Sequence, residues 1–94
     1  MLIVSGRLYI AKGQREAFLA ISDKAMIEAR RAPGCHDFVI AADPIEPDRV
    51  NIYEMWDSAD QLEAFRGQGP SGELTKLIER ADVRRYVIAS SGPA

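Results

Sequence analysis

The sequence has little sulfur chemistry and no long apolar run. A single cysteine, Cys35, excludes a disulfide within the chain. No apolar stretch approaches the roughly 18–20 residues that span a bilayer, and residues 1–7 turn polar before the core of a signal peptide could form. Twelve Lys and Arg against fourteen Asp and Glu leave no basic excess to attract a phosphate backbone or an anionic membrane. We therefore expect a soluble, cytoplasmic protein that binds neither nucleic acid nor membranes.

The sequence is also poor in histidine and cysteine, and it has no phosphate-binding loop pattern. Its one histidine, His36, directly follows its one cysteine, Cys35, which gives no convincing transition-metal site. On a strand these neighbours point to opposite faces, so they cannot act as a nucleophile and its base. The glycine-rich segment 67–72 lacks the lysine of a P-loop, and its glycines predict a hinge or lid instead. We expect neither a metal nor a cofactor.

Length and periodicity predict one small domain over residues 1–94. Ninety-four residues leave no room for a second core, and 47% hydrophobic with 28% charged residues is an ordinary globular composition, which argues against disorder. Ser58 and Gln61 form a capping-box pattern at the start of a helix, and Pro33-Gly34 ends an earlier one. Alternation and helical spacing predict strands over 2–10, 35–42, 49–56 and 82–90, and helices over 14–31, from Ser58 to the glycine-rich segment, and over 73–81.

The element order β-α-β-β-α-β predicts an α+β, ferredoxin-like fold, in which a four-stranded antiparallel sheet carries the helices on one face. The other face is left uncovered, and strand parity gives it a mixture of apolar and polar side chains. An apolar patch of this kind on a small protein usually indicates a partner. We therefore expect a homodimer that packs sheet on sheet, and we assign five residues to its interface rather than to catalysis: Arg7, Tyr9, Asn51, Tyr53 and Met55.

Four short segments follow one another in a recognisable order, in a match that covers nearly the whole chain. They are residues 32–35 (Ala-Pro-Gly-Cys), the Asp-Pro loop at 43–44, residues 54–58 (Glu-Met-Trp-Asp-Ser) and residues 62–65 (Leu-Glu-Ala-Phe). As an ordered set they resemble the antibiotic biosynthesis monooxygenase family. The resemblance implies a dimeric α+β barrel whose two sheets face one another, with a pocket between sheet and helices in each subunit. It also implies chemistry: some members oxidise polycyclic aromatic or quinol-type substrates with O2 and no metal or flavin, and others degrade haem.

The family's functional residues match this chain only in part. Trp56 matches the tryptophan that lines the pocket in members with known sites, and Lys76 falls near a functional histidine or arginine of the last helical segment. Phe65 stands where members often have a histidine, and Ile52 where some aromatic-oxidising members have an asparagine. Gly6 replaces the first-strand asparagine of the haem-degrading branch. These departures argue against haem degradation and weaken the case for aromatic oxygenation.

The expected pocket is apolar with few polar groups, and each candidate has an alternative structural role. Trp56 offers a flat face and one N–H donor, or else anchors the core. Glu54 is a general base whose pKa burial raises, or the ion-pair partner of Arg84 or Arg85. His36 is the natural proton acceptor near neutral pH, or a strand-start residue in contact with solvent. We take Trp56, His36 and Lys76 as catalytic candidates, and as substrate-binding candidates Leu8, Ile52, Glu54, Trp56, Leu62 and Phe65.

Three functions compete. The leading one is a cofactor-independent monooxygenase that acts with O2 on a small planar aromatic, quinol or polyketide-like substrate. The second is a non-catalytic dimer that binds a small hydrophobic ligand. The third is a proton-transfer isomerase, which would need His36 or Glu54 within hydrogen-bond distance of the ligand.

Overall fold

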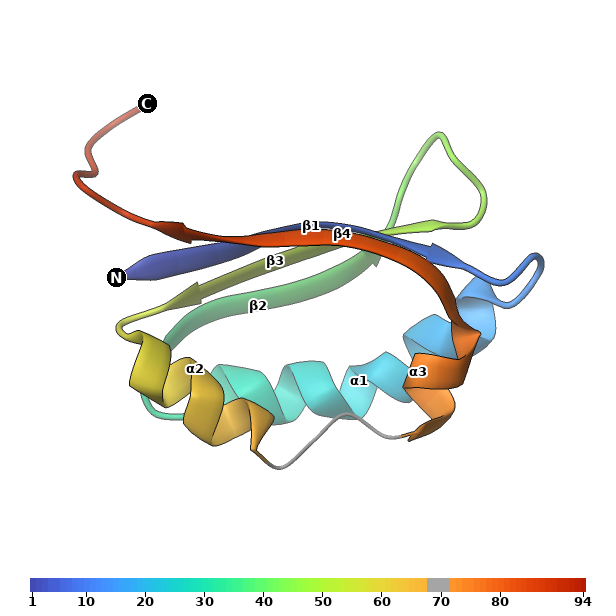
Figure 1. Cartoon of the computed structure of the whole chain (residues 1–94), viewed down its shortest axis with the longest axis horizontal. Helices are drawn as coiled ribbons and strands as arrows, with labels where there is room; N and C mark the ends of the chain where they lie inside the picture. Colours follow the sequence, from blue (N-terminus) through green and yellow to red (C-terminus); the bar gives the residue numbers. More distant parts are fainter. Residues whose placement is uncertain (68–71) are drawn as a thin grey trace.

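A single antiparallel sheet carries the helices on one face (Figure 1). The computed structural model describes residues 1–67 and 72–94. The strand order is β2-β3-β1-β4, and every neighbouring pair is antiparallel. This arrangement confirms the predicted α+β, ferredoxin-like fold. In chain order the elements are β1 (Leu2–Ile10), α1 (Arg15–Arg31), β2 (Cys35–Ala42), β3 (Arg49–Trp56), α2 (Ala59–Arg66), α3 (Gly72–Leu77) and β4 (Ile78–Val87).

The first three strands begin and end where the sequence predicts, and α1 begins one residue later than expected, at Arg15. Helix α1 buries Phe18, Ser22 and Ala29 against the sheet. Ser22 is a polar residue in this buried row, and its hydroxyl donates to the Phe18 carbonyl at 2.8 Å, so the buried oxygen keeps a hydrogen-bond partner.

The last helix and strand differ from the prediction. Helix α3 ends at Leu77 and β4 begins at Ile78, so the helix predicted over 73–81 is too long and the strand predicted over 82–90 begins too late. The reason is strand pairing, because β4 is already antiparallel to β1 from Ile78 onward. In addition, the Ala11 amide donates to the Leu77 carbonyl at 2.9 Å, so this carbonyl serves a loop instead of a further helical turn.

The core between sheet and helices consists of two clusters. One contains Trp56 and Leu62 and lies under α2; the other contains Ile10 and Phe18 and reaches α3. Ile40 and Val83 pack against both clusters. The boundary follows the sheet row in which Ile40, Ile52, Gly6 and Val83 are register partners. Because Gly6 has no side chain, only Ile40, Ile52 and Val83 contribute side chains from this row.

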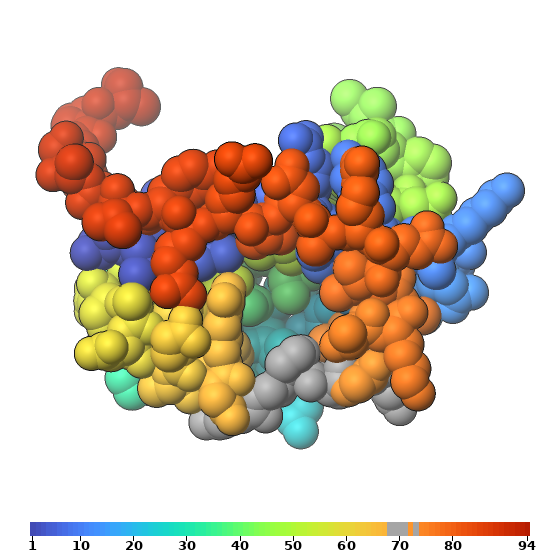
Figure 2. Space-filling model, in the orientation of Figure 1, coloured from blue at the N-terminus to red at the C-terminus, as the bar shows by residue number. Residues whose placement is uncertain are grey.

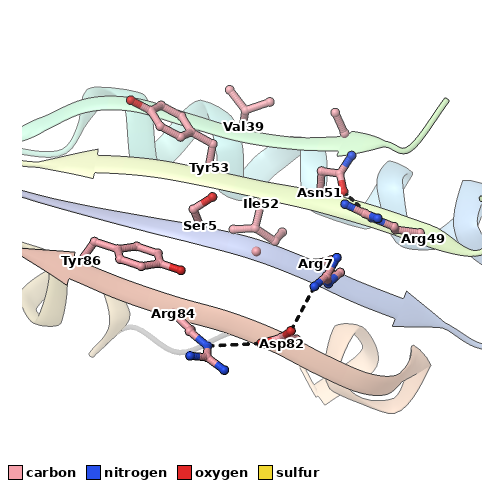
Figure 3. A pocket seen from close by; sticks show the side chains of 12 residues that line it. Ser5, Arg7, Val39, Arg49, Asn51, Ile52, Tyr53, Asp82, Arg84 and Tyr86 are labelled. Carbon is pink, nitrogen blue, oxygen red and sulfur yellow. Dashed lines mark hydrogen bonds and ion pairs between the residues drawn. The ribbon is translucent and has the colours of Figure 1, made fainter. Parts of the chain in front are cut away.

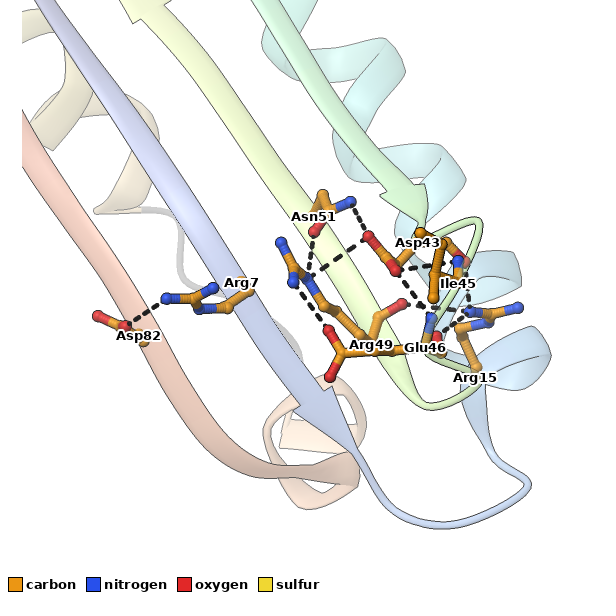
Figure 4. Close-up of polar contacts among 8 residues, drawn as sticks. All are labelled: Arg7, Arg15, Asp43, Ile45, Glu46, Arg49, Asn51 and Asp82. Atoms are coloured by element: carbon orange, nitrogen blue, oxygen red, sulfur yellow. Dashed lines mark hydrogen bonds and ion pairs between the residues drawn. The ribbon is translucent and has the colours of Figure 1, made fainter.

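The opposite face of the sheet is uncovered by any described element, and we call it the open face. The loop over residues 43–48 and the last residues of the chain both rise beyond the sheet on this side (Figure 1). The loop is tightly tied: Asp43 accepts from the amides of Ile45 and Glu46, and Arg15 donates to the Asp43 and Glu46 carbonyls (Figure 4). Among the described residues, no helix has the length and apolar character needed to cross a membrane.

Candidate functional site

Trp56 and Glu54 form a buried polar pair on the helix-covered face of β3. Trp56 is fully buried and Glu54 is 6% exposed. The indole Nε1–H donates to Glu54 Oε1 at 3.0 Å. The two side chains share a face because they are two residues apart on one strand. An indole N–H and a carboxylate thus satisfy each other in an otherwise apolar environment.

Aromatic side chains complete the environment of Trp56. The Phe65 ring packs on the indole at a centroid distance of 5.6 Å and an interplanar angle of 35°. Phe38, on β2, meets Phe65 edge to face at 5.8 Å and 67°. Pairs with these geometries contribute attraction beyond the area they bury. The indole, the two phenyl rings and Leu62 therefore form an aromatic-apolar wall between the sheet and α2.

Helix α2 holds this wall in place through its N-terminal cap. Ser58 Oγ accepts from the Gln61 amide at 3.2 Å, as the capping pattern predicts, and its hydroxyl donates to Gln61 Oε1 at 3.1 Å. The Gln61 side chain also lies against Gly34, where a Cβ would come within 2.1 Å of Oε1. Gly34 further adopts φ = +83°, a conformation that side chains disfavour. Glycine at this position therefore leaves room for the Gln61 side chain where the turn after α1 meets the start of α2.

Charged groups surround Glu54 unevenly. Arg66, the last residue of α2, places a guanidinium nitrogen 3.7 Å from Glu54 Oε2. Arg85 on β4 instead forms its ion pair with Glu63. Burial raises the pKa of the Glu54 carboxyl, and the Trp56 N–H and the Arg66 charge offset part of that rise. Burial, with Glu54 nearby, also raises the pKa of the Cys35 thiol.

A hollow in the surface lies between β4, α2 and α3 (Figure 2), and atoms of α1 and β2 are visible at its bottom. A small groove of about 140 Å³ lies between α2 and the turn after α1, lined by Ala32, Pro33, Gln61, Ala64 and Phe65. Phe65 therefore separates the buried Trp56 from a groove at the surface.

The open face carries the larger concavity, of about 570 Å³ (Figure 3). Its side chains are mostly polar: Arg7 pairs with Asp82 at 3.4 Å, and Arg84 lies 3.6 Å from the other oxygen of the same carboxylate. Tyr53 and Tyr86 lie toward the opposite end of the concavity. All five residues predicted for the dimer interface, Arg7, Tyr9, Asn51, Tyr53 and Met55, lie on this face.

The structure places the six predicted substrate-binding residues between the sheet and the helices, but not in one group. Glu54, Trp56, Leu62 and Phe65 lie together under α2, whereas Leu8 and Ile52 belong to the cluster that reaches α3. Ile52 itself lies in the row that contains Gly6, at the boundary between the two clusters.

The other two catalytic candidates are exposed. His36 lies at an irregularity in the pairing of β2 with β3. Its ring forms a hydrogen bond with the carboxylate of Asp57, outside the aromatic wall. Lys76 is exposed on α3. The structure therefore does not bring His36 to Trp56. The ion-pair partner of Glu54 is Arg66 rather than Arg84, and Arg85 acts on it only electrostatically.

Two residues of this site were not predicted from the sequence. Phe38 faces the wall because it is the register partner of Glu54, and strand parity on β2 could have indicated this. Arg66 could not be found in the same way, because nothing in the sequence relates the end of a helix to a residue twelve positions earlier on a strand. Among the described residues, no group of three His, Cys, Asp or Glu side chains gathers in a way that could hold a metal ion.

Comparison with known proteins identifies the family. The family model described as antibiotic biosynthesis monooxygenase matches residues 1–76. The chain belongs to this family. A solved structure named as a putative antibiotic biosynthesis monooxygenase from Chloroflexus aurantiacus is 28% identical; the match covers 98% of this chain and 96% of that one, with a TM-score of 0.78. A protein of the same name from Deinococcus radiodurans is 16% identical over 100% and 98%, with a TM-score of 0.81, and shows the fold alone. No curated protein matches the chain.

Membership in the antibiotic biosynthesis monooxygenase family supports a monooxygenase-type or small-molecule-binding role. The structure also gives a physical reason for one departure from the family's haem-degrading branch. A Cβ at Gly6 would come within 2.1 Å of the Asp82 carbonyl oxygen on the neighbouring strand β4. An asparagine at this position would therefore require β1 and β4 to move apart.

Proposed function

We propose that this chain binds a small planar aromatic, quinol or polyketide-like molecule between the sheet and α2, beside Trp56, and lets it react with O2 without metal or flavin. The observation that supports this most is the buried pair of Trp56 and Glu54 in an aromatic-apolar wall. Such a wall favours a flat apolar ligand and excludes water, while the carboxylate supplies one polar group for orientation.

The reaction requires electrons from the substrate itself. For an anthrone-type substrate, a ring CH2 and one O2 become a ring C=O and one H2O, so the carbon is oxidised by four electrons and O2 takes all four. In this scheme the chain's own residues bind the ring, remove a proton from it and keep water away. For the substrate to enter beside Trp56, the Phe65 ring must rotate away from the indole and toward the groove that it lines.

Binding without chemistry is the second candidate. One observation favours it: of the three residues predicted to be catalytic, only Trp56 belongs to the aromatic wall, because His36 bonds Asp57 and Lys76 is exposed. A pocket that binds a ligand without turning it over would retain the wall and need neither exposed group.

The proposal includes a homodimer formed through the open face. That face combines apolar side chains such as Ile3 and Met55 with charged pairs such as Arg7 and Asp82, so a two-fold copy offers both apolar contact and charge complementarity. The tied loop at 43–48 rises beside the face and would flank the second sheet.

Oxygen uptake tests the catalytic proposal. The assay uses metal-stripped protein with a panel of anthrones and hydroquinones, and a heat-treated sample as the control. We expect uptake above background with a quinone product, and a loss of at least tenfold in Trp56→Ala. Tyr86→Phe, on the opposite face, serves as the matched control. No uptake, with binding still detected by quenching of the single tryptophan, would select the second candidate.

A further inference from the structure

Glu54 is an unusual residue for the core position it occupies. Its register partners across the sheet are Val4 and Phe38, so an apolar residue would fit the surrounding packing. Burying a carboxylate instead is costly unless it is paired and hydrogen-bonded. A chain that keeps a charge at this position gains no stability from burying it, which points to a use in binding or chemistry.

The two oxygens of Glu54 differ in what they face. Oε1 accepts from Trp56, which fixes the carboxylate plane. Oε2 points toward Arg66 at 3.7 Å, longer than a normal N–H···O hydrogen bond. The Arg66 side chain is 44% exposed, so it reaches from the buried oxygen to solvent at the end of α2. No atom fits within that 3.7 Å separation, so a ligand oxygen beside Oε2 requires the half-exposed Arg66 side chain to swing outward; that oxygen then meets a proton acceptor on one side and a cation on the other.

The other charged groups near Glu54 have their own partners, although Arg85 also acts on Glu54 electrostatically. Arg85 from β4 and Glu63 from α2 pair with each other. The Cys35 thiol from β2 is partly buried, and burial raises its pKa, which favours the neutral form. Helix α1 contributes Arg30, which donates to the Phe38 carbonyl at 2.9 Å. Arg66 is thus the cation closest to a charge developing beside Oε2.

We propose that Glu54 accepts the proton of an acidic hydroxyl on the bound aromatic, and that Arg66 holds the oxyanion formed. The substrate class is therefore a phenol, hydroquinone or enolised ketone rather than a plain aromatic hydrocarbon. The ligand O–H bond breaks, the proton bonds to Oε2, and the electron pair stays on the ligand oxygen. Glu54 becomes neutral as the ligand becomes anionic, so the site keeps one negative charge beside Arg66.

Burial supports the direction of this transfer. It raises the pKa of Glu54, so the buried carboxylate is a better proton acceptor than an exposed one. A delocalised oxyanion beside the half-exposed guanidinium carries the same charge nearer to solvent. This inference rests on the proposed site beside Trp56, and it goes further by naming the proton acceptor, the anion-holding residue and the functional group that they select.

The test uses 4-nitrophenol, whose anion absorbs visible light, and 4-nitroanisole, which has no hydroxyl. At a pH where free nitrophenol is mostly neutral, we expect the protein to bind it as the anion. Glu54→Gln should abolish the increase in anion absorbance, and Arg66→Gln should weaken nitrophenol binding at least tenfold while leaving nitroanisole binding unchanged. Arg31→Gln, an exposed arginine at the end of α1, is the matched control. Equal anion formation in Glu54→Gln would overturn the proposal.

The single tryptophan provides an independent readout, because its indole N–H donates to Glu54. The indole ¹H–¹⁵N resonance should titrate with Glu54 in the wild type and not in Glu54→Gln, and it also shows whether that variant is folded. If neither nitro compound binds, both this inference and the proposed site are wrong. If the anion forms but no substrate consumes O2, only the oxygenase proposal fails.

Discussion

Glu54 shows at the residue scale how a site can reduce stability. Because burial raises its pKa in the folded state, the folded chain binds a proton more tightly than the unfolded chain above the ordinary value of 4.5. The free energy of unfolding therefore falls as pH rises through the window between 4.5 and the raised pKa. Glu63 shows the opposite sign, because its hydrogen bond to Arg85 lowers its pKa and stabilises the fold above 4.5.

The corresponding prediction concerns two glutamates on neighbouring elements. The free energy of unfolding of Glu54→Gln, measured relative to the wild type, should rise as the pH is raised from 4 to 8. That of the exposed Glu63→Gln should fall relative to the wild type over the same change. Urea unfolding of the three proteins at both pH values measures this. A Glu54→Gln difference that stays constant with pH would contradict the raised pKa.

Gly34 gives a second prediction at this scale, with an internal control in the chain. Both Gly13 and Gly34 have positive φ, but a Cβ at Gly13 meets nothing within 4 Å whereas one at Gly34 meets the Gln61 side chain. Gly13→Ala should cost roughly 1–2 kcal/mol through backbone strain alone. Gly34→Ala should cost about 1–3 kcal/mol more because of the clash. Adding Gln61→Ala to Gly34→Ala should remove most of this additional loss of unfolding free energy, as measured by urea unfolding. If the loss is unchanged, backbone strain at position 34 causes it instead of the clash.

At the scale of elements, the loop at 43–48 depends on one carboxylate. Hydrogen bonds from the Glu46 amide and the Asn51 side chain, more than the nearby Arg49, lower the Asp43 pKa from 3.8 to about 2. The charged form stabilises the fold above 3.8, and this stabilisation is lost as pH falls toward 2. Asp43→Asn should therefore lower Tm by several degrees at pH 7 and much less at pH 2.5. Asp23→Asn, exposed on α1, controls for loss of charge; an equal effect there would contradict the loop assignment.

The boundaries of the elements show which parts of the fold could be predicted from the sequence. β1, β2 and β3 were predictable to the residue because turn residues bound each of them, and in β3 the buried positions also alternate. β4 was not, because its opening residues 79–82 (Glu-Arg-Ala-Asp) suit a helix as well as a strand, and only pairing with β1 decides between them. In the site, parity placed Glu54 and Trp56 on one face, whereas the contact with Arg66 depends on where α2 ends in space.

At the scale of the whole molecule, the two faces of the sheet carry different kinds of side chains. The helix-covered face holds the aromatic wall and the buried carboxylate, and the open face holds mostly half-buried side chains in a broad concavity. The sequence predicted this division from strand parity alone. Parity cannot say what covers the open face, because a second copy and solvent produce the same alternation along each strand.

The homodimer is therefore the prediction that belongs to this scale. Light scattering at micromolar concentration should give about twice the chain mass of 10.4 kDa. Tyr53 lies on the central strand β3, opposite Ser5 and Val39, so Tyr53→Glu would place a charge in the middle of the interface and should produce a monomer. Ile27→Glu, on the exposed side of α1, makes the same change away from the sheet and should remain dimeric. A monomeric wild type would leave the open face to solvent, whereas a dimer lost equally in both variants would place the contact elsewhere.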